Sequence, residues 1–145
     1  RAAAASDAAP AGSDAAAWAA AGPMGVVSRT GNAPVGGRVA FLKYTEGEFM
    51  NAMKTECAEC NENVLIGFEA AEPAGVKIGV RLIAGVLARR IVPWVQVGDE
   101  VARGDRISLI QFGSRCDVYL PMSAKIRVRV GERVVGGETV LAVLE

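Results

Sequence analysis

The chain has 145 residues, enough for one domain, and 51% of them are hydrophobic, which permits a sizeable core. Sixteen Lys and Arg balance sixteen Asp and Glu, so nothing indicates the basic face of a nucleic-acid-binding protein. The sequence contains no histidine, which excludes histidine-based acid–base catalysis and histidine metal ligation by this chain. No apolar run reaches the roughly 18–20 residues of a transmembrane helix.

Residues 1–22 form an alanine-rich, low-complexity stretch. Alanine favours helix, but apart from Trp18 nothing contributes to an apolar face, so we expect a disordered or weakly helical segment. Residues 23–32 read as a transition. We therefore divide the chain into a low-complexity leader with its transition, residues 1–32, and a β domain, residues 33–145.

The next segments are rich in β-branched and aromatic residues and are separated by glycines, which is typical of an all-β domain. The polar stretch 46–63 is expected to form a short helix or an excursion loop. Strands are predicted at residues 38–44, 64–69, 76–84, 87–95 and 126–130. The last of these alternates apolar residues with arginines, which predicts a half-buried strand.

Cys57 and Cys60 form a C-x-x-C motif, which suggests a zinc or redox site. A structural zinc site needs four ligands, and Cys116 is the only other cysteine. The βαβ pattern of a thioredoxin-like protein is absent. We interpret these residues as reduced thiols of a cytosolic protein and expect no metal site.

Residues 97–107 and 130–140 are two copies of one pattern. Each begins Val-Gly-Asp/Glu, the glycines fall in register, and each copy continues into an apolar strand. Two ordinary β-turns would also produce such segments, but the matched register favours related hairpins. Hairpins of this kind are typical of the barrel-sandwich fold of biotinyl and lipoyl carrier domains.

Gly113 and Ser114 interrupt the apolar, strand-forming run from Leu109 to Pro121. A Gly-Ser pair usually marks a turn, because Gly adds backbone freedom. A serine hydroxyl can also attack the carbonyl that precedes it, so the pair is a candidate self-cleavage site. We expect Ser114 on or beside a β-turn, near a concave surface.

The run LIQFGSRCDVYLP at residues 109–121 resembles the processing site of the phosphatidylserine decarboxylase family, in its short bacterial and archaeal form. The similarity extends from about Ala33 to Ala142 and includes FMNA at 49–52, IAGVLARRIV at 83–92 and GETVLA at 137–142. The resemblance implies cleavage between Gly113 and Ser114. It also implies a β-chain that ends at Gly113 and an α-chain whose pyruvoyl cofactor derives from Ser114.

The resemblance further implies a decarboxylase that converts phosphatidylserine, or the archaeal ether lipid equivalent, into the ethanolamine lipid. Such an enzyme would sit peripherally on the cytoplasmic face of the membrane. The pyruvoyl carbonyl condenses with the substrate amine and accepts electrons as CO₂ leaves. Arg89 and Arg90 are candidate ligands of the lipid phosphate, because arginine binds phosphate well, although adjacent arginines on a strand are often structural.

Family members carry a histidine shortly before the segment matched by Ala33-Pro34-Val35, and an Asp-Gly motif further upstream, which assist self-cleavage. The corresponding stretch here, residues 28–32, has no histidine, and neither Asp7 nor Asp14 is followed by glycine. We expect an inactive fragment or frame-disrupted product that stays uncleaved, with any membrane anchor in a missing amino-terminal part. A divergent non-enzyme is the other interpretation.

Two other functions stay open. Ala52-Met53-Lys54 is similar to the attachment motif of biotinyl and lipoyl carriers, but Lys54 lies far upstream of both hairpins and is followed by Thr55. A non-catalytic interaction module on the same β scaffold is the second alternative.

Overall fold

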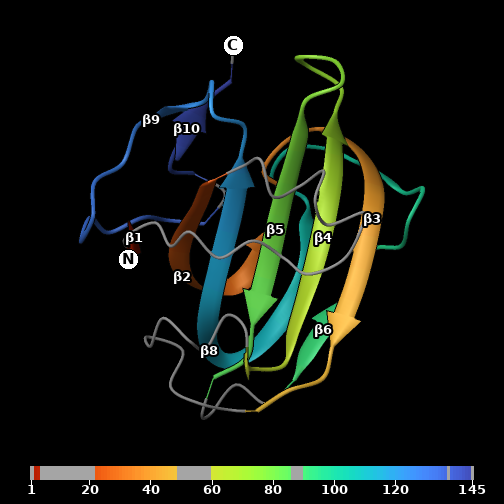
Figure 1. Ribbon diagram of the computed structural model, residues 1–145, viewed down its shortest axis with the longest axis vertical. Helices are drawn as coiled ribbons and strands as arrows, with labels where there is room; N and C mark the ends of the chain where they lie inside the picture. The colour runs from red at the N-terminus through yellow and green to blue at the C-terminus, as the bar shows by residue number, and fades with distance from the viewer. Residues whose placement is uncertain (1, 4–21, 49–59, 86–89, 137, 145) are drawn as a thin grey trace.

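The computed structural model describes residues 2–3, 22–48, 60–85, 90–136 and 138–144. These residues form β-strands joined by turns and loops, which confirms the all-β prediction (Figure 1). The alanine-rich stretch 4–21 and the polar stretch 49–59 lie outside the described residues, so the predictions made for them stay predictions.

One curled, antiparallel sheet dominates the fold. Its strands follow the order β1-β2-β8-β5-β4-β3-β7, and β6 pairs with β8 off this path. The strands are β1 Ala2–Ala3, β2 Gly22–Asn32, β3 Gly37–Thr45, β4 Asn63–Ala70, β5 Lys77–Ile83, β6 Ile91–Pro93, β7 Glu100–Val101 and β8 Arg106–Leu120. Strands β9, Lys125–Ile126, and β10, Ala142–Val143, form a separate pair.

The predicted strands at 38–44, 64–69 and 76–84 correspond to β3, β4 and β5 within one or two residues. The expected strand 87–95 is reduced to β6 within the described residues. The sheet also includes β2, whose residues the sequence had assigned to a transition. Strand β2 pairs with the whole second half of β8, from Gly22 opposite Leu120 to Ser28 opposite Ser114.

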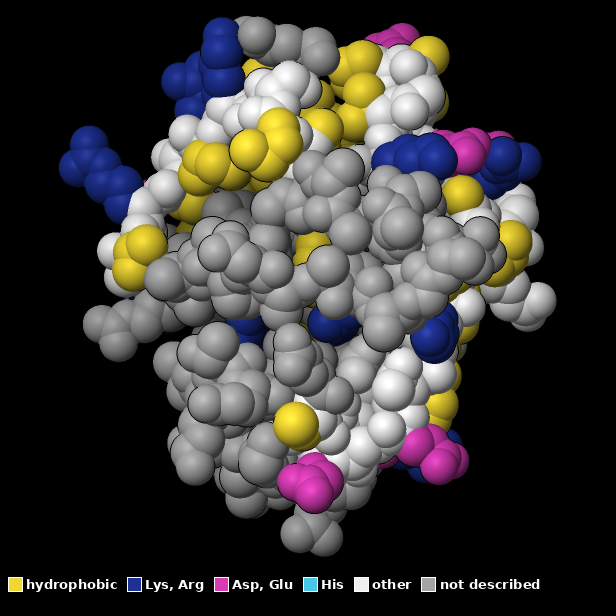
Figure 2. All heavy atoms as spheres, viewed as in Figure 1, with side chains coloured by type: hydrophobic (Ala, Val, Ile, Leu, Met, Phe, Trp, Pro, Cys, Tyr) yellow, Lys and Arg dark blue, Asp and Glu magenta, His cyan; other side chains and the backbone are white. Residues whose placement is uncertain are grey.

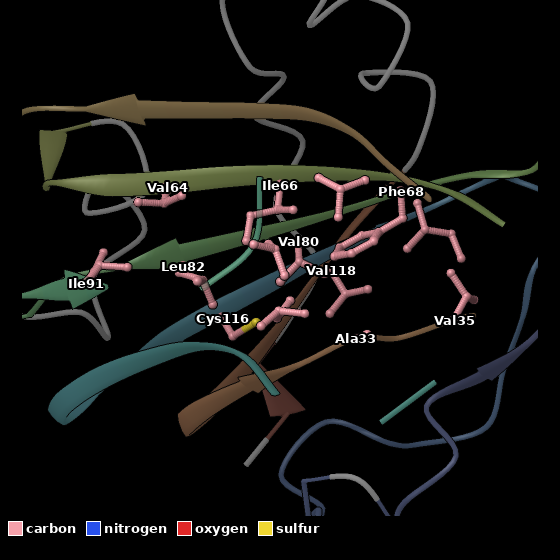
Figure 3. Packing of buried hydrophobic residues seen from close by; sticks show 14 of the residues in the cluster. Ala33, Val35, Val64, Ile66, Phe68, Val80, Leu82, Ile91, Cys116 and Val118 are labelled. Atoms are coloured by element: carbon pink, nitrogen blue, oxygen red, sulfur yellow. The ribbon is translucent and has the colours of Figure 1, made fainter. Parts of the chain in front are cut away.

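The hydrophobic core lies on one face of this sheet. Alternate residues of the central strands point into it, as expected for a period of two residues. They are Val64, Ile66 and Phe68 of β4, Ile78, Val80 and Leu82 of β5, and Cys116, Val118 and Leu120 of β8 (Figure 3). Full burial of an aliphatic or aromatic side chain stabilises a fold by about 1.5–3 kcal/mol, so this layer holds the sheet together.

The two repeat copies form equivalent turns, as predicted. Gly98 and Gly131 have φ angles of 99° and 85°, a conformation that favours glycine. The amide of Asp105 donates to the carbonyl of Ala102 at 3.1 Å, and the amide of Glu138 donates to that of Val135 at 3.2 Å. Only the first copy joins the main sheet, where β7 pairs with β3.

The prediction of a half-buried strand at 126–130 was wrong. Strand β9 ends at Ile126, and the Ile126 and Val130 side chains are 51% and 74% exposed. Val128 alone of the three apolar residues packs against the core. The reason is position: the chain leaves the main sheet after Leu120, and the described residues cover Ile126 only in part and Val130 only slightly.

Candidate functional site

Ser114 lies within β8 and not beside a β-turn, which corrects the sequence-based expectation. Strand-forming residues flank it on both sides, and neighbouring strands pair with both halves of β8. The extended backbone therefore continues through Gly113 and Ser114, although the sequence pair is typical of turns.

The pairing of β8 is irregular where the Gly113–Ser114 bond lies. Leu109 pairs with Thr30 of β2 and Ser114 pairs with Ser28, so five steps along β8 match two along β2. Such extra residues bend a strand and strengthen its twist, and they are frequent next to active sites.

The neighbour on the other edge of β8 changes at the same place. Ile110 pairs with Ile91 of β6, whereas Arg115 pairs with Ile83 of β5. The candidate scissile bond therefore lies in a gap in the strand pairing of β8. On one side of this gap β8 pairs with β6, and on the other side it pairs with β5.

The segment expected to correspond to the histidine-bearing stretch of the family, residues 28–32, runs antiparallel to this gap. Ser28 is the direct partner of Ser114. Residues opposite each other in an antiparallel pair are about 4.5–5.5 Å apart. A segment 86 residues earlier in the chain thus lies directly beside Ser114 in the sheet.

A buried ion pair follows Ser114 directly. The Arg115 guanidinium donates to both carboxylate oxygens of Asp117, with Nε to Oδ1 at 2.6 Å and Nη2 to Oδ2 at 3.0 Å. The two side chains are only 7% and 1% exposed. Arg81 of the adjacent strand β5 lies over the Tyr119 ring of β8, with 5.5 Å between the guanidinium carbon Cζ and the ring centroid. Paired, hydrogen-bonded charges of this kind are tolerated in a protein interior.

A cavity of about 360 Å³ opens on the core face of the sheet, and Cys116, two residues after Ser114, is part of its wall. Aliphatic side chains of β5, β8 and the carboxy-terminal segment form most of the wall. They include Ile78, Val80, Val118, Leu120, Val134 and Leu141. Arg103 and Glu138 supply charged groups. A mostly apolar cavity with a few polar groups is typical of small-ligand sites.

The Cys116 thiol is a poor nucleophile. Burial, with a smaller contribution from Asp117, raises the pKa of its thiol to about 12. The thiolate is the nucleophilic form of cysteine, so Cys116 serves as wall and not as a reactive group.

The structure does not gather the other candidate residues around Ser114. Arg89, Lys54 and Cys57 lie outside the described residues. Arg90 is exposed and precedes β6, and it is not among the described residues that line the cavity. Cys60 is exposed. Sequence reasoning missed the Arg115–Asp117 pair, although two charged residues within an apolar run were the signal.

Known proteins match the part of the chain that includes β8. The family described as phosphatidylserine decarboxylase matches residues 30–142. The chain belongs to the phosphatidylserine decarboxylase family. The match includes the last three residues of β2 and the whole of β8, and therefore the Gly113–Ser114 pair.

Several curated relatives are similar to this chain, and each is called a phosphatidylserine decarboxylase proenzyme. The protein of Zymomonas mobilis is 48% identical over 109 residues, which are 75% of this chain and 44% of that protein. The protein of Erythrobacter litoralis is 50% identical over 111 residues, which are 75% and 43%. The chain thus spans less than half the length of these relatives. No solved structure matches it significantly.

The described residues include no helix that is long and apolar enough to cross a membrane.

Proposed function

We propose that the protein containing this chain is a pyruvoyl-dependent phosphatidylserine decarboxylase, and that the chain contributes the self-cleavage site and the cofactor precursor Ser114. The observation that carries the proposal is the coincidence of two features at one bond. The family match runs through Gly113–Ser114, and the same bond lies in the irregular gap of β8.

In the proposed cleavage the Ser114 hydroxyl attacks the Gly113 carbonyl, and the C–N bond breaks to leave an ester. Elimination then releases the Gly113 carboxylate, and one water hydrolyses the remaining enamine to a pyruvoyl group and ammonia. Atoms balance with one water consumed. The extra residues of β8 support this step, because a bulged backbone is freer than a regular ladder to adopt the geometry of attack.

The pairing of β8 also supports retention of the new chain end. Residues 115–119 are paired with β2 on one side and with β5 on the other. After cleavage the segment that begins at Ser114 would therefore stay within the sheet. A pyruvoyl group at that end would supply an electron sink for decarboxylation.

The cavity beside Cys116 is the candidate site for the phospholipid substrate. Its aliphatic wall suits hydrocarbon, and the exposed Arg103 at the wall suits a phosphate. A lipid substrate is the reason to place the protein at a membrane surface, and we propose the cytoplasmic face because the cysteines are interpreted as reduced thiols.

The test uses the complete gene product that contains this chain. We expect mass spectrometry to find a cut between Gly113 and Ser114, a pyruvoyl group at position 114, and CO₂ release from phosphatidylserine. Ser114→Ala should abolish all three. Ser108→Ala, at a buried serine of the same strand, is the matched control and should leave them intact. An uncut, active Ser114→Ala protein would refute the proposal.

The carrier-domain alternative is not favoured, because the family match covers residues 30–142.

A further inference from the structure

The buried charges of the protein lie together, next to the candidate cleavage site. Among the side chains that the structure describes, the buried charged ones are Arg81, Arg115 and Asp117. The other described Lys, Arg, Asp and Glu side chains are exposed or half-buried, and Figure 2 shows such side chains on the outside of the molecule. Arg81 of β5 is the register partner of Asp117 of β8, and Arg115 directly follows Ser114.

A buried ion pair adds little net stability to a fold. Desolvation of the two charges offsets most of their attraction, and well-packed apolar residues of similar volume stabilise a protein equally well or better. The best-supported use of buried polar groups is to fix one arrangement of the chain among several. The burial of Arg115 and Asp117 within a largely apolar strand therefore points to a need for a fixed backbone directly after Ser114.

The ion pair connects residue 115 to a position that the sheet holds on both sides. Asp117 is fully buried, and its register partners are Gly25 of β2 and Arg81 of β5. Side chains two residues apart on a strand lie on the same face, so the two hydrogen bonds from Arg115 to Asp117 require an extended backbone between them. If residue 115 left the sheet, the Asp117 carboxylate would stay buried without its bidentate partner.

Cleavage at Gly113–Ser114 would create a chain end at this place. Chain ends fray, with opening free energies close to zero, unless contacts hold them. We infer that Arg115 and Asp117 are a positioning pair, which holds residue 114 within the sheet once it has become the end of a chain. This inference rests on the proposed function, because an uncut strand has no end at Ser114. The pair acts through the backbone of β8 and need not touch the substrate.

The test compares cut and uncut forms of the complete gene product, each with and without the ion pair. Ser114→Ala supplies the uncut form, and Arg115→Met with Asp117→Leu removes the pair without leaving a lone buried charge. The readout is amide hydrogen exchange at residues 115–117, resolved by NMR. In the cut protein, loss of the pair should speed this exchange by roughly 10²–10³-fold, the penalty for a buried charge without its partner. In the uncut protein the exchange should change by less than about tenfold, because the chain continues through Gly113.

Steady-state kinetics supply a second readout. An end whose opening free energy is near zero is out of place about half of the time, so kcat for phosphatidylserine should fall at least about twofold. KM should stay unchanged, because the pair does not line the proposed substrate cavity. Arg38→Met with Glu69→Leu, at an exposed ion pair on β3 and β4, is the matched control and should change neither kcat nor the exchange at 115–117.

Arg115→Lys keeps the charge without the bidentate geometry, so it should give an intermediate acceleration, and it serves for the same comparison if the double variant does not cut itself. A cut, folded variant with wild-type exchange at residues 115–117 would overturn the inference and leave the proposed function standing. Equal acceleration in the cut and uncut forms would also overturn it, since the pair would then serve the fold alone. A wild-type protein that stays uncut would overturn both.

Discussion

Asp99 and Glu132 occupy equivalent places in the two repeat copies and make the same hydrogen bond. The Asp99 carboxylate accepts from the Gln96 amide at 2.8 Å, and the Glu132 carboxylate accepts from the Arg129 amide at 2.9 Å. Each of these hydrogen bonds closes a turn. In both turns the residue directly before the carboxylate, Gly98 or Gly131, is a glycine with positive φ. The surroundings differ, since the Gly98 amide donates to Val39 and the Val39 amide donates to Asp99 in the main sheet.

This difference makes a matched pair of substitutions informative. Gly98→Ala and Gly131→Ala each place an L side chain at positive φ, with no other atom within 4 Å of the new Cβ, so the local cost is about 1 kcal/mol in both. We expect Gly98→Ala to lower the global melting temperature, because its turn is bonded to β3. Gly131→Ala should act mainly on local opening, seen as faster amide exchange near residues 125–143. Equal falls in melting temperature would contradict this assignment.

The buried Arg115–Asp117 pair predicts strong sensitivity to loss of one partner. Arg115→Ala or Asp117→Ala leaves one charge buried without its counter-charge, which typically costs about 3–5 kcal/mol of unfolding free energy. Urea denaturation measures this loss.

The double variant Arg115→Met with Asp117→Leu is the control. It removes both charges and fills similar space, so it should be less destabilised than either single variant. A double variant as unstable as the sum of the two single ones would mean that the ion pair itself is not what the fold requires.

Cys116 should resist alkylation in the folded protein. With its pKa raised to about 12, only about one thiol in 10⁴ is ionised at pH 8, whereas an ordinary cysteine is substantially ionised there. Iodoacetamide at pH 8, followed by trypsin and mass spectrometry, should modify peptide 55–77, which contains the exposed Cys60, and spare peptide 116–125. In denaturant both peptides should react. Rapid native labelling of Cys116 would show that the thiol is not buried.

The same shift predicts lower stability at alkaline pH. The unfolded thiol ionises from about pH 8.5, while the folded one stays protonated until about pH 12. The native state therefore binds more protons in that window, and unfolding free energy falls as pH rises through it. Cys116→Ala should reduce this alkaline loss in a pH series of urea melts; an unchanged slope would count against it.

The 145-residue chain by itself should remain intact. A positioned acid or base typically contributes about 10²–10⁴-fold to a proton-transfer step, and this sequence has no histidine to act on Ser114. Intact-mass measurement after purification should find one species. Two species that correspond to residues 1–113 and 114–145 would show that another residue performs this role.

The sequence by itself indicated the all-β class, three of the central strands and the residues of the candidate site. Strands β3, β4 and β5 were predictable because short runs rich in β-branched and aromatic residues, punctuated by glycines, favour extended segments locally. The two equivalent turns were predictable from glycine register. Gly113 and Ser114 were singled out because the run 109–121 resembles the processing site of the family, which a turn-like Gly-Ser pair alone would not have indicated.

Only the tertiary structure decided what surrounds those segments. The partnership of Ser28 with Ser114, the exchange of β6 for β5 beside β8, and the burial of Arg115 against Asp117 depend on strands that are distant in sequence. The exposure of Ile126 and Val130 depends on which other segments pack against them. An alternating sequence pattern carries no information about that packing. Local preference acts over a few residues, whereas register and burial are set by long-range pairing, and the sequence pattern constrains that pairing only weakly.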